Sequence, residues 1–189
     1  MIKALIFAGG SGQRMNSRSK PKQFLELHGK PIYTLEHFEF HEEISDITVV
    51  CISDWIEELR GFLKRYGIRK VSTIVPGGDT GHDSIRLGLE AMQENTNSED
   101  IVLIHDGVRP LINEELISAN IEKTKRCGNA ITVEPVRESV IRCADGENIA
   151  EVPPRSEMFI AKAPQTFYFG DIIRLYEKSK EDGIRSIDS

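Results

Sequence analysis

The residues best suited to chemistry lie near the start of the chain, in AGGSGQRM at 8–15 and KPKQF at 20–24. Glycines at three of four positions, 9–12, leave backbone N–H groups uncovered, and such a turn can curl around phosphate oxygens. Arg14 and Lys22 place two positive charges beside this turn. The stretch therefore predicts a cradle for a triphosphate.

Two familiar glycine motifs do not fit this turn. A Walker loop ends in Gly-Lys-Ser/Thr, whereas Lys22 lies too far along the chain and is followed by Gln23. The dinucleotide-binding fingerprint needs a third glycine where Met15 stands. The alternative is an ordinary strand-to-helix turn that binds no ligand.

A second glycine-rich loop, GGDTGHDS at 77–84, precedes a predicted helix. Its backbone groups, with the hydroxyl of Ser84, could contact the edge of a base. The alternative is a plain connection in which Asp83 or Ser84 caps the helix.

A third loop, HDGVRP at 105–110, follows an apolar run. Asp106 would stand at the tip of a buried strand, where one carboxylate together with substrate phosphates suits Mg²⁺. Arg109 is close enough in sequence to orient this acid or a substrate oxygen. The alternative is a structural Asp–Arg pair that closes the loop.

Composition limits the classes of function. The chain has 189 residues, enough for one domain, and a net charge of −6, which argues against general binding to nucleic acid or acidic membranes. Residues 1–30 nevertheless carry six basic residues and one acid, a local positive patch that suits a small polyanion. Three scattered cysteines, no signal peptide and no apolar run of about 20 residues indicate a cytoplasmic protein without a membrane span.

Short apolar runs alternate with helical patterns, which is typical of βαβ units and a mostly parallel sheet. Strands are expected at 3–7, 47–52, 71–75, 100–105, 130–133 and 166–169. Helices are expected at 31–41, 55–66, 83–93, 113–127 and 171–180.

Ligands of such sheets bind beyond the carboxyl ends of the strands. This rule predicts that the loops at 8–22, 76–84, 106–110 and 163–166 lie along one edge of the sheet. They supply phosphate-binding backbone, cations and one acid, but no evident nucleophile. We therefore expect direct transfer between a nucleotide and an acceptor that brings its own nucleophile.

Segment 138–160 departs from the alternation and reads as a β-hairpin, with strands at 139–143 and 149–152. A hairpin inserted in an α/β domain has little core of its own. We expect it to pack against a partner subunit.

Five segments in this order resemble the sugar- and polyol-phosphate cytidylyltransferases, over nearly the whole chain. They are AGGSGQRM with KPKQF, PGG with DS, IHDGVRP, VRES and APQTF. The resemblance implies a Rossmann-like nucleotidyltransferase fold and an Mg²⁺-dependent homodimer in the cytoplasm. The implied reaction joins CTP and a polyol phosphate into a CDP-polyol and pyrophosphate.

The resemblance also implies roles for individual residues. Arg14 and Lys22 match the catalytic cations, and Asp106 matches the acid on the metal and ribose side, with Arg109 beside it as a substrate-binding residue. The nucleotide-binding positions are Ala8, Gly9, Gly10, Ser11, Gly12, Gly78, Ser84 and Asp106.

Segment 138–160 resembles the dimerisation arm of that family, which reaches into the neighbouring subunit's site; it is called the arm below. On it, Arg155 matches a residue that binds the acceptor phosphate, and Ser139 stands where a substrate-contacting threonine is usual.

Some positions depart from the family pattern. Ala163 replaces a threonine, and Gly81 stands where the methylerythritol branch often has arginine. AGG, PKQF and Val108 favour ribitol 5-phosphate as the acceptor, with 2-C-methyl-D-erythritol 4-phosphate as the alternative. The last strand and helix of the family domain are expected to be missing after Ser189, so a non-catalytic nucleotide-binding module is a further alternative.

Overall fold

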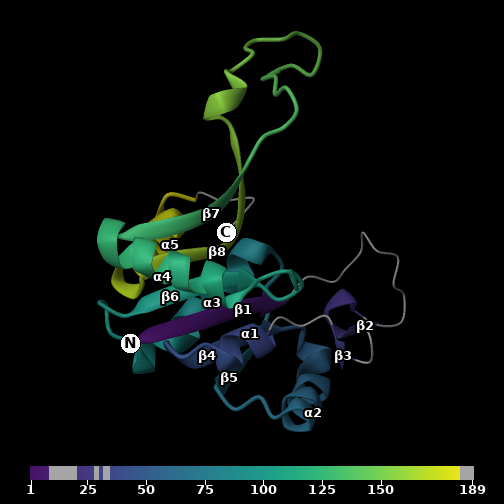
Figure 1. Ribbon diagram of the computed structural model, residues 1–189, viewed down its shortest axis with the longest axis vertical. Coiled ribbons are helices and arrows are strands. Elements are labelled where there is room, and N and C mark those ends of the chain that lie inside the picture. The colour runs from purple at the N-terminus through teal and green to yellow at the C-terminus, as the bar shows by residue number, and fades with distance from the viewer. Residues whose placement is uncertain (9–20, 28–29, 32–34, 184–189) are drawn as a thin grey trace.

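A six-stranded sheet with the strand order β5-β4-β1-β6-β8-β7 forms the centre of the molecule (Figure 1). The computed structural model describes residues 1–8, 21–27, 30–31 and 35–183. The strands of the sheet are β1 (Ile2–Ala8), β4 (Ile44–Cys51), β5 (Val71–Pro76), β6 (Ile101–Asp106), β7 (Asn129–Pro135) and β8 (Phe159–Tyr168).

The sheet is mixed but mostly parallel, as the sequence predicted. β1 pairs in parallel with β4 and β6, and β4 pairs in parallel with β5. β8 is antiparallel to both of its neighbours, β6 and β7, so it alone runs against the other strands of this sheet. The central strands are continuous apolar runs because both of their faces are buried.

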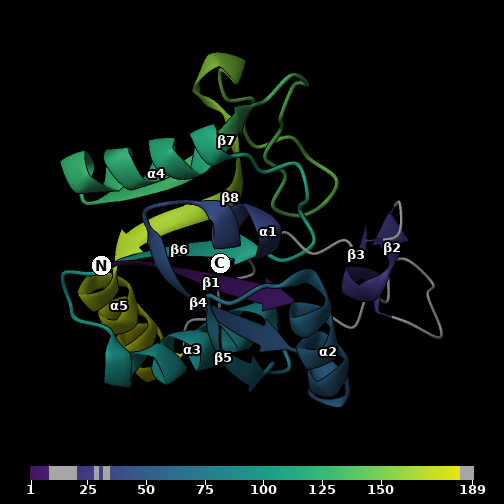
Figure 2. The same ribbon diagram turned by 60° about the horizontal axis from the view of Figure 1, so that its bottom comes forward.

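Helices cover both faces of the sheet (Figure 2). One core cluster joins the sheet to α1 (Leu35–Phe40), α2 (Ile56–Tyr66) and α4 (Glu114–Cys127). A second cluster joins the opposite face to α3 (Gly81–Met92) and α5 (Phe169–Glu181). α3 lies especially close to the sheet because Gly88 has no side chain: a Cβ there would stand 2.4 Å from Leu5 Cδ1.

Short elements complete the fold. β2 (Glu26–Leu27) and β3 (Lys30–Pro31) form a small antiparallel ladder. The short helices are η2 (Lys22–Phe24), η3 (Ser53–Trp55), η4 (Gln93–Asn95) and η5 (Arg155–Glu157).

The starts of α1 and α3 differ from the predictions, as does that of α5, which begins at Phe169 and not at 171. The expected helix 31–41 begins only at Leu35, and Lys30–Pro31 is a strand. α3 begins at Gly81, and its cap is Thr80, whose hydroxyl accepts a hydrogen bond from the Asp83 backbone N–H at 3.0 Å. The cap at Asp83 or Ser84, which belonged to the alternative interpretation of this loop, was therefore wrong, because Thr80 holds the capping position and accepts the Asp83 N–H.

The region around β8 also differs from the predictions. The expected loop 163–166 and residues 166–168 of the expected strand 166–169 are parts of β8, which already begins at Phe159, and Phe169 begins α5. Pro164 lies where the register of the β7–β8 ladder shifts, and its carbonyl oxygen accepts a hydrogen bond from Thr132 Oγ1 at 2.8 Å.

The arm extends far from the body between β7 and β8 (Figure 1). Its expected hairpin was only partly right, because the two sides meet in a single isolated antiparallel bridge between Arg142 and Glu151. The tip is a turn in which Asp145 Oδ1 accepts hydrogen bonds from the N–H groups of Glu147 and Asn148. Among the residues that the structure describes, the arm has no second layer to support a longer ladder.

Candidate active site

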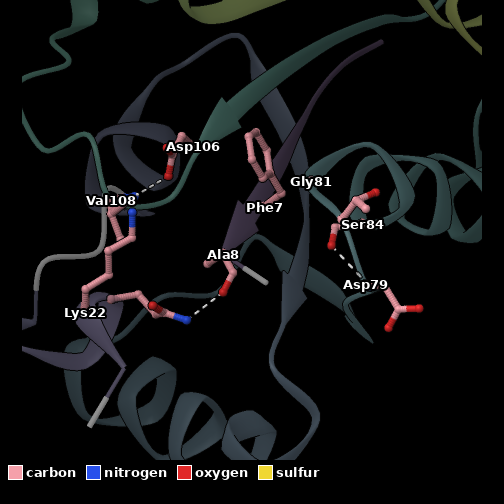
Figure 3. A pocket seen from close by; sticks show the side chains of 11 residues that line it. Phe7, Ala8, Lys22, Asp79, Gly81, Ser84, Asp106 and Val108 are labelled. Carbon is pink, nitrogen blue, oxygen red and sulfur yellow. Dashed lines mark hydrogen bonds between the residues drawn. The ribbon is translucent and has the colours of Figure 1, made fainter. Parts of the chain in front are cut away.

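A cavity of about 350 Å³ opens at the carboxyl edge of the sheet, beyond the ends of β1, β5 and β6 (Figure 3). It brings together residues from three of the loops that the sequence placed there. The lining residues are Phe7, Ala8, Lys22, Gln23, Gly78, Asp79, Thr80, Gly81, Ser84, Asp106 and Val108.

Lys22 enters the cavity from η2, and a neighbouring side chain holds this short helix in place. Gln23 is fully buried, and its Nε2 donates a hydrogen bond to the carbonyl oxygen of Ala8 at 2.6 Å. This bond ties η2 to the last residue of β1. In Figure 3, Lys22 extends from η2 toward the turn at Asp106 and Val108.

The loop between β5 and α3 forms the opposite wall of the cavity. Ser84 is buried, and its Oγ accepts a hydrogen bond from the backbone N–H of Gly78 at 3.1 Å. Gly78 must be glycine here, since a Cβ would stand 2.5 Å from the Cβ of Asp83. Ser84 therefore holds this loop against the start of α3 by a hydrogen bond, and Asp79 lies at the tip of the loop.

Asp106 ends β6 and faces the cavity. Its Oδ1 accepts a hydrogen bond from the backbone N–H of Val108 at 3.1 Å, and its Oδ2 lies 3.5 Å from Arg109 Nε. The carboxylate is thus held in a fixed orientation and keeps partial access to solvent. Both interpretations from the sequence, a structural pair and a ligand-facing acid, are compatible with this geometry.

Arg109 belongs to a second cavity, of about 540 Å³, on the other side of Asp106. His105 lines this second cavity and is almost fully buried. Burial lowers the pKa of His105 to about 4, so its imidazole is neutral near pH 7. His105 is therefore a neutral wall residue at that pH, as its place at a buried strand end suggested.

The remaining predicted residues lie elsewhere. Ser139 and Arg155 are exposed on the arm, where Arg155 Nη1 donates a hydrogen bond to the carbonyl oxygen of Arg137 at 3.1 Å. Five predicted residues lie outside the part of the chain that the structure describes: Gly9, Gly10, Ser11, Gly12 and Arg14.

The donor set around Asp106 limits how a metal could be held. In the described part of the chain, no group of three or more histidine, cysteine or acidic side chains has metal-binding proximity. A dedicated protein cage for zinc or calcium is therefore not formed by those residues. One carboxylate beside a cavity that can hold substrate phosphates is instead the arrangement that Mg²⁺ uses when a substrate supplies the other oxygens.

Sequence reasoning missed Gln23, Asp79 and Thr80 as lining residues. Asp79 and Thr80 stand inside the second glycine-rich loop, so their position was the available signal. Gln23 carries no such signal, because a buried glutamine is recognised only through its contact across the fold.

In the described ranges, no helix has the length and apolar character needed to cross a membrane.

Comparison with known proteins points to one family. A family model described as 2-C-methyl-D-erythritol 4-phosphate cytidylyltransferase (IspD) matches residues 2–189. The ribitol-5-phosphate cytidylyltransferase of Streptococcus agalactiae serotype Ia is 48% identical over 188 residues, which are 98% of this chain and 79% of the relative. The 2-C-methyl-D-erythritol 4-phosphate cytidylyltransferase of Alkaliphilus metalliredigens is 35% identical over 183 residues, 95% of this chain and 74% of the relative.

A solved structure shows the same fold. The crystal structure of 4-diphosphocytidyl-2C-methyl-D-erythritol synthase from Anaerococcus prevotii matches with a TM-score of 0.82 at 27% identity. The match covers 99% of this chain and 78% of that one.

Proposed function

Because the chain belongs to the 2-C-methyl-D-erythritol 4-phosphate cytidylyltransferase (IspD) family and is a cytidylyltransferase, we propose that it transfers CMP from CTP to ribitol 5-phosphate. The products are CDP-ribitol and pyrophosphate. The family assignment confirms the resemblance that the sequence motifs predicted. The observation that carries the choice of acceptor is the 48–49% identity to several ribitol-5-phosphate enzymes, against 35–38% to several methylerythritol-phosphate enzymes.

In the proposed reaction an oxygen of the acceptor phosphate attacks the α-phosphorus of CTP. A new P–O bond forms as the bond between the α-phosphorus and its bridging oxygen breaks, and pyrophosphate leaves. The acceptor brings its own nucleophile, and the hydroxyl oxygens of Thr80 and Ser84 in the cavity lining already accept hydrogen bonds from the backbone. The protein's task is then to position the two phosphates and stabilise the negative charge between them.

We assign the charge stabilisation to Lys22 and Arg14. Lys22 lines the first cavity, and the bond from Gln23 fixes η2 without using the ammonium group. Arg14 is assigned by the family motif alone. The backbone of residues 8–12 would hold the CTP phosphates, and Gly78 with Ser84 would form the wall against the base.

Asp106 fits the role of magnesium ligand and ribose-side acid. Its orientation is fixed by Val108 and Arg109, and it lines the cavity beside Lys22. When bound there, Mg²⁺ would neutralise triphosphate charge. Asp106 itself would keep the nucleotide aligned with the acceptor, and Arg109 would contact the acceptor on the far side.

The active form is proposed to be a homodimer in the cytoplasm. Apolar side chains are exposed along the arm, each by 47–63%, which is unusual for a surface that faces only water. They are Ile141, Ile149, Val152, Phe159 and Ile160. A second copy of the chain would cover them and receive Ser139 and Arg155 next to its acceptor. Three cysteines scattered along the sequence are consistent with a reducing compartment.

The direct test is pyrophosphate release with Mg²⁺, each of the four nucleoside triphosphates and each of the two acceptors. We expect release with CTP and ribitol 5-phosphate. Release with 2-C-methyl-D-erythritol 4-phosphate only would replace the proposed acceptor by the alternative. CTP binding without release from either acceptor would support a non-catalytic nucleotide-binding module.

A further inference from the structure

The Asp106–Arg109 pair links the linings of the first and second cavities. Asp106 lines the first cavity, Arg109 lines the second, and their side chains approach to 3.5 Å. A molecule with its phosphate at Lys22 and its remaining atoms beyond Arg109 would therefore occupy both cavities. At about 540 Å³, the second cavity has the size of a small-molecule site.

Most of the wall of the second cavity is apolar. Its apolar lining residues are Pro110, Leu111, Ile112, Leu116, Val133 and Ala163. Thr132 also lines it, but its hydroxyl is already engaged, since it donates to the carbonyl oxygen of Pro164 and accepts from Asn120 Nδ2. A ligand must therefore be recognised by the few polar groups that remain.

Glu134 and Lys162 are the polar pair on this wall. They stand on neighbouring strands, β7 and β8, and their side chains form an ion pair with 3.2 Å between Lys162 Nζ and Glu134 Oε2. Both are partly exposed, at 47% for Glu134 and 34% for Lys162, so a ligand in the cavity can reach them. The pair offers oxygen acceptors and N–H donors side by side.

The charges in this cavity balance. Arg109 is matched by Asp106, and Lys162 is matched by Glu134. No described lining residue supplies an unmatched positive charge for a second phosphate. An uncharged polyol chain fits this lining, because its hydroxyl groups can hydrogen-bond to the Glu134–Lys162 pair while its carbon atoms contact the apolar side chains.

We propose that the second cavity holds the hydroxylated carbon chain of the acceptor and that Glu134 and Lys162 select this chain by hydrogen bonding to its hydroxyl groups. This inference rests on the proposed function and adds the two residues that distinguish a polyol from a bare phosphate. It places the acceptor phosphate on the Lys22 side of the Asp106–Arg109 pair and the polyol chain on the Arg109 side.

The test measures steady-state kinetics of Glu134→Gln and Lys162→Met. We expect the KM for ribitol 5-phosphate to rise about tenfold in each, the loss typical of one hydrogen bond to a charged group. The KM for CTP should remain within about twofold, because neither residue lines the first cavity. Lys125→Met is the matched control: it removes a cation that pairs with Glu43 and Glu122 outside both cavities.

Glycerol 3-phosphate, used as a competitor, separates recognition from a merely structural effect. Its chain is shorter, so its inhibition constant should stay unchanged in both variants while the KM for ribitol 5-phosphate rises. Equal losses for both compounds, or an unchanged KM for ribitol 5-phosphate, would overturn the proposal. Wild-type protein that binds CTP but does not use ribitol 5-phosphate would overturn the proposed function itself, and this inference with it.

Discussion

Gln23 Nε2 donates a hydrogen bond to the carbonyl oxygen of Ala8, and this contact joins η2 to the end of β1. The Ala8 carbonyl stands where the sheet ends and the predicted phosphate loop begins, and Lys22 is the residue next to Gln23. The buried amide of Gln23 therefore helps to set the position of the neighbouring, proposed catalytic cation.

Replacing Gln23 should reduce turnover although the side chain does not face the reacting atoms. Gln23→Met keeps the length of the side chain but removes the N–H donor, so the Ala8 carbonyl oxygen loses its hydrogen bond. The short helix η2, which carries Lys22, is then no longer tied to β1. We expect kcat to fall at least about tenfold and the free energy of unfolding to fall by about 1–3 kcal/mol. Gln93→Met, on an exposed glutamine, should change neither quantity. An unchanged kcat in Gln23→Met would show that Gln23 does not position Lys22.

Lys22 itself should contribute more to kcat than Gln23, the residue that holds η2 in place. Lys22→Ala removes a positive charge next to the reacting phosphates, and kcat should fall by roughly two orders of magnitude or more with the fold intact. Circular dichroism and thermal melting check the fold, and Lys178→Ala on the exposed face of α5 is the control. Full activity in Lys22→Ala would exclude a catalytic role.

Asp106→Asn separates the charge of this residue from its structural bond. The asparagine oxygen can still accept the N–H of Val108, so the turn should persist while the negative charge is lost. We expect the Mg²⁺ concentration needed for half-maximal activity to rise several-fold, because a charged ligand has been replaced by a neutral one. An unchanged magnesium titration would place the metal elsewhere.

Two glycines inside helices should respond in opposite directions to alanine. Gly88→Ala would place a Cβ 2.4 Å from Leu5 Cδ1 and 2.8 Å from Val50 Cγ2, so we expect a loss of about 1–3 kcal/mol from overpacking. Gly61→Ala on α2 has no atom within 4 Å of its new Cβ and should gain up to about 1 kcal/mol. Urea unfolding of both variants tests the packing of α3 on the sheet.

His105 should make stability depend on pH in the acid range. Its pKa is lowered to about 4 in the folded protein, against an ordinary value of 6.5, so the unfolded chain takes up the proton first as the pH falls. The contribution is intact above pH 6.5 and is lost between pH 6.5 and 4, up to about 3 kcal/mol. Unfolding of His105→Gln should lack this component, and identical pH profiles for the two proteins would contradict it.

The central strands and the glycine loops could be predicted because their signals are local. Continuous apolar runs such as Ile101–Asp106 occur where a strand is buried on both faces, and the loops after them must then share one edge. That rule correctly placed Lys22, Gly78 and Asp106 together, and all three line the first cavity.

What could not be predicted depends on contacts between distant segments. The strand predicted at 166–169 was too short because Pro164 is locally unfavourable in a strand, and the antiparallel pairing of β8 to both β6 and β7 outweighs that preference. The bond from Gln23 to Ala8 spans 15 residues and has no sequence signature. The ion pair of Glu134 with Lys162 depends on the same unforeseen pairing of β7 with β8.

Strand β8 takes part in three regions of the molecule, and this restricts which sequence changes the protein can tolerate during evolution. One strand begins within the arm, continues as a wall of the second cavity and ends as an inner strand of the sheet. An insertion or deletion in it would shift all three at once, because every later residue would change its partner and its face. Acceptor preference can therefore drift between relatives by exchange of side chains at fixed positions such as Lys162, while the length of the strand stays constant.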